Sequence, residues 1–115
     1  MNNPAEVIEK IENSIKALEL SNSELQTIGL EKSKADSNYK IAYKKELMKE
    51  KLNNTPIGII KEIVSGKEDI AELKLKKDIA EVSYNTCLSS IANIRIQIET
   101  YRSILAWLRA EYESI

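Results

Sequence analysis

The sequence predicts an all-α fold: a long antiparallel helical hairpin, packed as a coiled coil, with a short helix at its tip. Apolar residues recur at helical spacing through nearly the whole second half of the chain. The 115 residues include only three glycines and two prolines, and no stretch alternates apolar and polar residues as a strand does. Two long segments of similar length flank a short apolar one, which is the order expected of a helical hairpin.

The last predicted helix, about residues 67–113, carries the clearest pattern. Its apolar residues are spaced alternately three and four apart, a 3.5-residue repeat that places them on one face of a coiled-coil helix. Only Lys77 interrupts the row, and the row contains neither Gly nor Pro. At about 1.5 Å per residue this helix is roughly 70 Å long. We call the row the C-terminal seam: Ile70, Leu73, Lys77, Ala80, Tyr84, Cys87, Ile91, Ile94, Ile98, Tyr101, Leu105, Leu108 and Tyr112.

The first predicted helix, about residues 4–53, has a weaker pattern. Asn3 is suited to cap its start and Pro4 to begin its first turn. A capping box and a glycine fall within residues 21–29, so we expect a continuous helix with a kink, and the alternative is a break near residue 21. Its end is expected near Asn53-Asn54. The apolar stripe is Ile8, Ile11, Ile15 and Leu18, then Leu25, Ile28, Ala35, Tyr39, Ala42 or Tyr43, and Leu47.

A short apolar helix, about residues 56–65, is predicted between the two long ones. Thr55-Pro56 has the form of a capped helix start, and Ser65-Gly66 has the form of a helix stop. Ser65 with Glu68 makes a second capping box, from which the last helix begins. The three helices are expected to form one domain, residues 1–115, because a chain of this length has room for a single core.

The last helix also carries apolar residues away from its seam, and these predict an oligomer. A second apolar face on a long helix usually packs against another helix. That helix is either folded back from the first helix or supplied by another subunit. We expect the second, so that the chain forms a homo-oligomeric bundle. The off-seam residues are Leu75, Ile79, Val82, Leu88, Ile96, Ile104 and Trp107.

The composition argues against catalysis. The chain has no histidine, and therefore no imidazole base and no histidine-ligated metal. Cys87 falls on the seam, where a small buried hydrophobe is expected rather than a nucleophile. No glycine-rich phosphate loop occurs, and carboxylate pairs such as Glu68 and Glu72 suit a solvated helix face. We therefore expect no enzyme activity, no metal and no cofactor.

The lone cysteine and the hydropathy of the chain bear on its location. One cysteine cannot form an intramolecular disulfide, which suits a reducing compartment. No apolar stretch approaches the roughly 20 residues that a membrane span needs. The sequence therefore predicts a cytoplasmic protein without a membrane partner.

The arginines stand at regular intervals near the C-terminus. Arg95, Arg102 and Arg109 are the only three in the chain, and they are seven residues apart along one edge of the seam. One interpretation is that they pair across the hairpin with glutamates such as those at positions 6, 9 and 12. The other is that they grip phosphates or an acidic partner. With Trp107 they are the expected partner or oligomer edge.

A lysine-rich stretch with two tyrosines is the candidate nucleic-acid site. The segment from Lys32 to Lys51 contains seven lysines and three acidic residues, which gives it a net charge of +4. Lysines beside aromatic rings bind single-stranded nucleic acid, with phosphates on the lysines and bases on the rings. The alternative is that the tyrosines belong to the seam and the lysines only keep the surface soluble. The candidate residues are Lys40, Lys44, Lys45, Lys49, Tyr39 and Tyr43.

Two segments resemble a known group of proteins. Tyr39-Lys40-Ile41-Ala42-Tyr43, and the stretch from Ser103 to Tyr112 that contains Trp107-Leu108-Arg109, are similar to segments of small all-helical proteins encoded by phages and prophages. The layout is similar to that of UvsY-type recombination mediators. That resemblance implies a ring-like oligomer that binds single-stranded DNA and helps to load a recombinase.

We therefore expect a non-enzymatic, oligomeric coiled-coil protein, an accessory factor of phage DNA recombination or replication. Its expected partners are further copies of itself, single-stranded DNA, or a recombination or replication protein. Two alternatives remain at this point. One is a protein-binding inhibitor or adaptor that uses an exposed helix face, and the other is a structural coiled-coil assembly factor.

Overall fold

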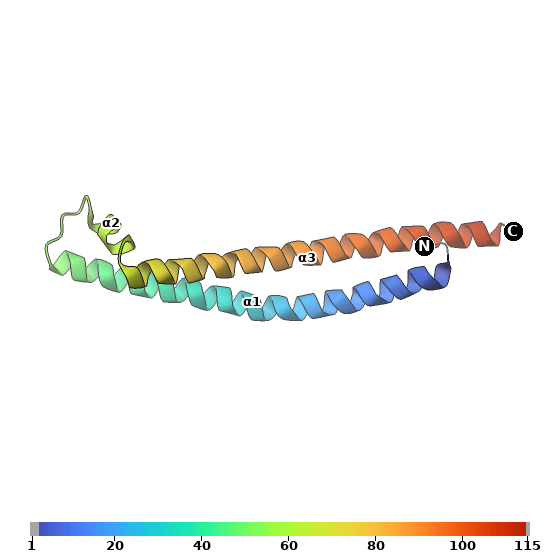
Figure 1. Cartoon of the computed structure of the whole chain (residues 1–115), viewed down its shortest axis with the longest axis horizontal. Helices are drawn as coiled ribbons and strands as arrows, with labels where there is room; N and C mark the ends of the chain where they lie inside the picture. The colour runs from blue at the N-terminus through green and yellow to red at the C-terminus, as the bar shows by residue number, and fades with distance from the viewer. Residues whose placement is uncertain (1–2, 115) are drawn as a thin grey trace. The chain divides into compact units, whose positions relative to one another are not determined.

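The fold is all-α, as the sequence predicts. The structure is a computed structural model, and it describes residues 3–114. It contains the long helices α1 (Pro4–Leu52) and α3 (Glu68–Glu113), joined through the short helix α2 (Ile60–Ser65) (Figure 1). Within residues 3–114 no strand occurs. The order long helix, short helix, long helix confirms the predicted helical-hairpin fold class.

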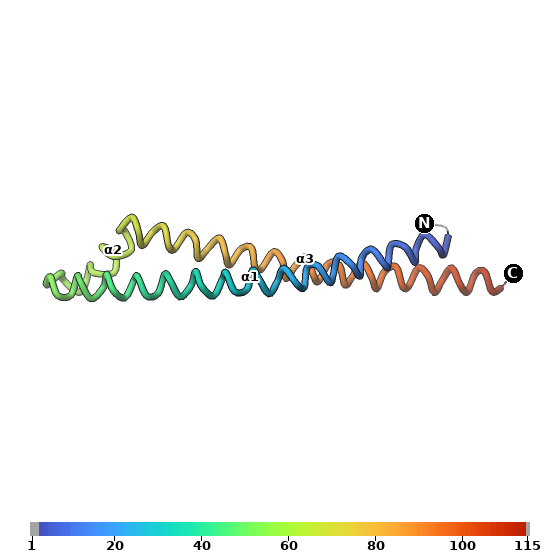
Figure 2. The backbone as a smooth tube through the Cα atoms, turned by 90° about the horizontal axis from the view of Figure 1, so that it is seen from below, coloured from blue at the N-terminus to red at the C-terminus, as the bar shows by residue number. Residues whose placement is uncertain are grey.

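The chain divides into two compact units, each containing a segment of α1 and a segment of α3. Unit 1 joins the α1 segment up to Gln26 with the α3 segment from Asn85 onward, and unit 2 is Thr27–Tyr84. Within each unit the two segments run antiparallel (Figure 1). In unit 2, α2 lies over the C-terminal end of α1 (Figures 1 and 2).

Both ends of α1 follow from the residues found there. At the start, the Ala5 N–H donates to Asn3 Oδ1 at 2.9 Å, which is the predicted N-cap. At the other end Asn54 adopts a left-handed conformation, with φ of 57°. Its N–H donates to the Lys51 carbonyl at 3.1 Å, and the Thr55 N–H donates to the Glu50 carbonyl at 3.0 Å. This pair of bonds is a Schellman motif, so the helix ends where the sequence predicts.

Helix α1 continues through residues 21–29, so the break considered near residue 21 does not occur. Gly29 lies against the Tyr84 ring, and the space there does not require a glycine, since a β-carbon would lie 3.5 Å from Tyr84 Cε2, an ordinary contact. The glycine therefore weakens the helix without ending it.

The short helix begins later than the sequence predicts. Its expected start was residue 56, but Ile57–Ile59 form a turn and α2 begins at Ile60. The Ile59 N–H donates to the Pro56 carbonyl three residues back, at 3.2 Å, so the chain first makes one tight turn. Ser65 is the last residue of α2, and the Ala71 N–H makes the first backbone bond of α3, to the Lys67 carbonyl at 2.9 Å.

The seam predicted for the last helix is the inner face of α3 in both units. Its members from Ile70 to Leu108 are all buried or half-buried, whereas their neighbours are almost all exposed. Ile70 is 1% exposed, and Ile91 and Leu108 are each 5% exposed. The exception is the last member, Tyr112, which is 58% exposed.

The stripe predicted for the start of α1 is partly wrong. Val7 is fully buried, whereas Ile8 and Ile15 are 38% and 41% exposed. The half-buried residues that follow Val7 are Ile11, Ser14 and Leu18. Positions 7 and 14 lie whole heptads before residues 21, 28, 35 and 42, which are also covered, and a continuous helix keeps one register. The register of the whole helix therefore outweighs the larger side chains at positions 8 and 15.

Unit 1 has a small core that includes the cysteine. Its buried residues are Val7, Cys87, Ile91 and Leu108. The Cys87 thiol lies 3.6 Å from the Ser21 carbonyl and is 8% exposed. The thiol therefore fills space in the helix interface, as its position on the seam predicts.

Candidate nucleic-acid interface

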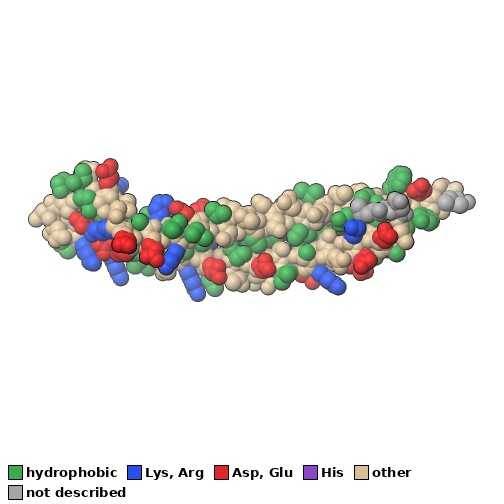
Figure 3. Space-filling model, viewed as in Figure 1, with side chains coloured by type: hydrophobic (Ala, Val, Ile, Leu, Met, Phe, Trp, Pro, Cys, Tyr) green, Lys and Arg blue, Asp and Glu red, His purple; other side chains and the backbone are tan. Residues whose placement is uncertain are grey.

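The charged residues of α1 in unit 2 are sorted between two sides of the helix. Between Lys32 and Lys51, every exposed charged residue is a lysine, whereas Asp36, Glu46 and Glu50 are partly covered. In the space-filling view, Lys and Arg side chains project outward from this part of the chain (Figure 3). We call the exposed lysines the lysine face of α1: Lys34, Lys40, Lys44, Lys45, Lys49 and Lys51.

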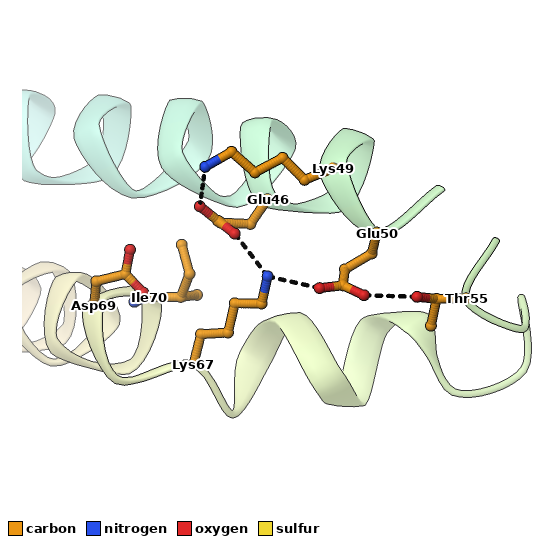
Figure 4. A network of polar contacts seen from close by, with 7 residues as sticks. All are labelled: Glu46, Lys49, Glu50, Thr55, Lys67, Asp69 and Ile70. Carbon is orange, nitrogen blue, oxygen red and sulfur yellow. Dashed lines mark hydrogen bonds and ion pairs between the residues drawn. The ribbon is translucent and has the colours of Figure 1, made fainter. Parts of the chain in front are cut away.

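Lys67 pairs with two of the three acids of this segment. Its Nζ donates to Glu46 Oε2 at 2.7 Å and lies 2.7 Å from Glu50 Oε1 (Figure 4). The other Glu50 oxygen accepts from Thr55 Oγ1 at 2.6 Å. Both glutamate side chains are only 16% exposed. We call these four residues the Lys67 clasp.

The clasp shifts the pKa values of its members. The hydrogen bond from Lys67 is the main reason that the pKa of Glu46 and the pKa of Glu50 lie below their usual value. Lys49 adds to the effect on Glu46, through a bond of 3.2 Å. In return, the bond to Glu46, followed by that to Glu50, raises the pKa of Lys67. All three groups therefore stay charged over a wider pH range than they would in an unfolded chain.

The clasp predicts acid-sensitive stability. Because the folded pKa values of Glu46 and Glu50 lie below the usual 4.5, their contribution is present above that pH and is lost as the pH falls through the lowered values. The free energy of unfolding, measured by urea titration at fixed protein concentration, should decline as the pH falls below 4.5. In the Lys67→Gln variant this decline should be shallower.

Lys76→Gln is the matched control, since Lys76 makes only an exposed pair with Glu72 at 3.7 Å on its own helix. It should leave the acid decline unchanged. At the alkaline end, the contribution of Lys67 is present below its usual pKa of 10.5 and is lost as the pH rises through the raised folded value. Equal acid slopes for wild type and Lys67→Gln would contradict a stabilising clasp.

The third acid of the segment is covered by a different lysine pair. Asp36 Oδ2 lies 2.9 Å from Lys40 Nζ, and Asp36 Oδ1 lies 4.0 Å from Lys77 Nζ. The hydrogen bond from Lys40 is the largest cause of the lowered pKa of Asp36. Lys40 and Lys49 are thus paired with acids of α1, although both lysine side chains remain about two-thirds exposed. Exposed pairs of this kind are weak and leave the lysines available to a polyanion.

The two candidate tyrosines lie side by side and are half-buried. The ring centroids of Tyr39 and Tyr43 are 5.9 Å apart, and the rings are tilted by 46°. Lys77 Nζ lies 5.9 Å from the centroid of Tyr39, a cation–π contact that occupies that ring. Tyr39 is therefore a residue of the helix interface, and the structure gives it less freedom to stack on a base than the sequence suggests.

The arginines and Trp107 belong to unit 1, whereas the lysine face belongs to unit 2. Arg95, Arg102 and Arg109 are all exposed. Arg102 Nη1 lies 3.6 Å from Glu99 Oε1 on the same helix. Within residues 3–114, no ion pair joins any of the three to glutamates 6, 9 or 12 of α1, so the pairing considered from the sequence is not formed. Trp107 is 66% exposed on α3.

Unit 2 also contains a polar cleft of about 190 Å³. Its lining contains two lysines and two acids, so it has no excess charge to attract a polyanion. The lysine face is therefore the stronger candidate. The cleft is lined by Lys32, Ser33, Asp36, Lys77 and Glu81.

Sequence reasoning missed Lys67 and the apolar side chains between the exposed lysines. Ile41 and Met48 are 53% and 58% exposed. With Lys45 they follow a spacing of four and three along one side of α1, and this spacing is the signal that could have revealed them. Lys67 has no such signal, because its partners lie 21 and 17 residues earlier in the chain.

The class that the fold and the site define is an all-α helical hairpin with a one-sided lysine face. None of the helices within residues 3–114 combines the length and apolar character that a membrane span requires. The same residues contain no group of three or more acidic or cysteine side chains arranged to hold a metal ion. Comparisons of the chain with protein families, with curated proteins and with solved structures give no match.

Proposed function

We propose that this chain is a non-enzymatic accessory protein of DNA recombination or replication that binds single-stranded DNA on the lysine face of α1. The observation that carries the proposal is the sorting of charge: every exposed charge between Lys32 and Lys51 is positive. Phosphates are attracted by such a row because each neutralising lysine releases condensed counterions from the nucleic acid. The Lys67 clasp supports the proposal, since it pairs a further lysine with two carboxylates that would otherwise offset the positive charge of that row.

The charge of the two units agrees with this location. Unit 2 contains twelve lysines and ten acidic residues, a net charge of +2. Unit 1 contains five basic and eight acidic residues, a net charge of −3. A polyanion is therefore attracted to unit 2 and repelled by unit 1, although the whole chain is slightly acidic.

A single strand fits this face better than a duplex does. Ile41 and Met48 expose apolar surface between the lysines, and unpaired bases can rest apolar faces on such side chains. A duplex keeps its bases stacked and would offer only phosphates.

The test is binding of a fluorescently labelled single-stranded oligonucleotide, followed by anisotropy across a salt series. In the Lys44→Gln/Lys45→Gln variant we expect weaker binding and a salt dependence that is shallower by about 1.4, because each phosphate contact to a single strand contributes about 0.7 to the slope. Neither lysine forms an ion pair within residues 3–114, so their removal should leave the helical content unchanged.

The matched control is Lys10→Gln/Lys16→Gln. These lysines are also exposed on α1 and also lack an ion pair within residues 3–114, but they belong to unit 1. The control removes the same charge and should bind like wild type. If both variants weaken binding equally, the attraction is a bulk charge effect and the lysine face is not the site. If wild type does not bind at about 50 mM salt, the nucleic-acid function is wrong.

A second candidate function, a protein-binding adaptor, is favoured by the tip of unit 2. Leu52 and Ile57 are 79% and 87% exposed, more than any other large apolar residue described. Exposed apolar side chains grouped at one place usually contact another protein. This candidate leads if the oligonucleotide experiment fails.

A further inference from the structure

Unit 1 exposes a row of uncharged residues on the side of α3 opposite its seam. The residues are spaced alternately three and four apart, so they share one face of the helix. None is charged, in a chain of which 30% of the residues are charged. We call them the outer row of α3, and all are exposed: Ser89, Asn93, Ile96, Thr100, Ser103 and Trp107.

The chemistry of the outer row suits contact with another helix. Ile96 is 64% exposed and Trp107 is 66% exposed. Thr100 Oγ1 donates to the Ile96 carbonyl at 2.9 Å, so its hydroxyl is already satisfied and its methyl group is available for packing. Ser89 and Ser103 are small, which allows a neighbouring backbone to approach closely. A solvated helix face would instead carry Lys and Glu.

The area that the chain exposes shows how much surface is available for burial. The accessible surface is 8437 Å². A compact folded protein of 13.0 kDa exposes about 6,300 Å² by the usual scaling of area with mass. The surplus of about 2,100 Å² exceeds the roughly 800 Å² that each partner buries in a standard protein–protein interface.

Unit 1 has a small core, which further apolar burial would stabilise. Among the residues of unit 1 that the structure describes, four are buried: three are aliphatic and the fourth is Cys87. Two helices without other support seldom bury enough apolar area to offset their conformational entropy. A second copy of the chain is always present with the first, and it can provide this further apolar burial.

The unpaired charges of unit 1 are complementary between copies. On α3, Arg95 and Arg109 form no ion pair within residues 3–114. On α1, glutamates 6, 9, 12, 19 and 24 are exposed and also form none among the described residues. Basic groups on one helix and acidic groups on the other are able to meet when two copies pack together.

We propose that two copies of this chain associate through the outer row of α3, with each copy contributing the same face. Such an interface is isologous: it places the outer row of one copy against that of the other and buries Ile96 and Trp107 of both. The proposal is independent of nucleic-acid binding.

The test is sedimentation equilibrium of the full chain between about 1 and 100 µM, with Ile96→Glu as the variant. We expect wild type to be dimeric. A carboxylate at the centre of the interface should raise the dissociation constant at least about 100-fold. The control is Leu20→Glu, which introduces the same charge at a residue of α1 in the same unit that is 63% exposed. It should change the dissociation constant less than about threefold.

A second measurement covers the case in which Ile96→Glu fails to fold. Ser103→Cys, made in a Cys87→Ala chain, should react slowly with a thiol reagent at 100 µM protein and rapidly after dilution below the dissociation constant. Ser23→Cys in the same background lies on an exposed part of α1 and should react rapidly at both concentrations. A monomeric wild type at 100 µM, equal weakening by Ile96→Glu and Leu20→Glu, or a Ser103→Cys thiol that stays reactive at 100 µM would each overturn the proposal.

Discussion

Ile70→Ala is expected to lower the free energy of unfolding by about 2–5 kcal/mol. Ile70 is 1% exposed and is among the largest fully buried side chains of the structure. The substitution removes three buried carbon atoms at the start of α3, and the surrounding helices can close only part of the space that is left. Urea unfolding at one fixed protein concentration measures the loss.

The control for this prediction is Ile79→Ala. Ile79 is the same residue type on the same helix and in the same unit, but it is 56% exposed. Its replacement should change the free energy of unfolding by no more than about 0.5 kcal/mol, because little burial is lost and alanine favours the helix. Similar losses for both variants would show that the seam does not form the interface between α1 and α3.

The sequence predicts α3 well because its apolar repeat is unbroken. Every seam position from Ile70 to Leu108 is covered, although Lys77 is one of them. Lys77 is tolerated because its stem packs in the interface while its Nζ lies over the Tyr39 ring and within 4.0 Å of Asp36. A heptad pattern therefore predicts which face is inward without predicting how a polar member is accommodated.

The start of α1 shows where counting apolar residues fails. Ile8 and Ile15 fit a helical stripe as well as Val7 and Ser14 do, and they are more hydrophobic. The choice between the two sets is made by the register of the remaining helix, and the apolar pattern is weak over residues 21–29. As a result the helix buries a valine and half-buries a serine, while two isoleucines stay partly exposed.

The candidate site could be predicted only in part. The lysine-rich segment is evident from composition, but its one-sidedness depends on which residues α1 turns inward. The separation of charges on α1 also depends on Lys67. This residue lies between α2 and α3 and pairs with Glu46 and Glu50 near the end of α1. No local pattern predicts a contact of this kind, because the geometry of the residues between α1 and α3 decides it.

The short helix α2 contributes to the core of unit 2 and does more than connect α1 to α3. Ile60 and Val64 are one helical turn apart and are 3% and 0% exposed, so the short helix buries one face. A helix of six residues is not stable in isolation. Its stability therefore comes from the burial of these two side chains in unit 2.

Val64→Asp should consequently destabilise the protein by about 4 kcal/mol or more, because an unpaired carboxylate would replace a fully buried aliphatic side chain. Hydrogen exchange should show loss of protection over residues 60–65, and urea unfolding should show the loss of free energy. Ile63→Asp is the positional control: it places the same group one residue earlier, where the side chain is 38% exposed, and its effect should be clearly smaller.

The pH dependence of stability separates the effect of the new charge from the effect of the new side-chain shape. Burial raises the pKa of an aspartate, so the folded Val64→Asp protein takes up a proton at a higher pH than the unfolded chain does. Its deficit relative to wild type should therefore shrink as the pH falls toward about 4. Val64→Asn has nearly the same shape and cannot ionise, so its deficit should not depend on pH in this way. A Val64→Asp protein as stable as wild type at pH 7 would show that α2 does not need its buried face in order to stay in place.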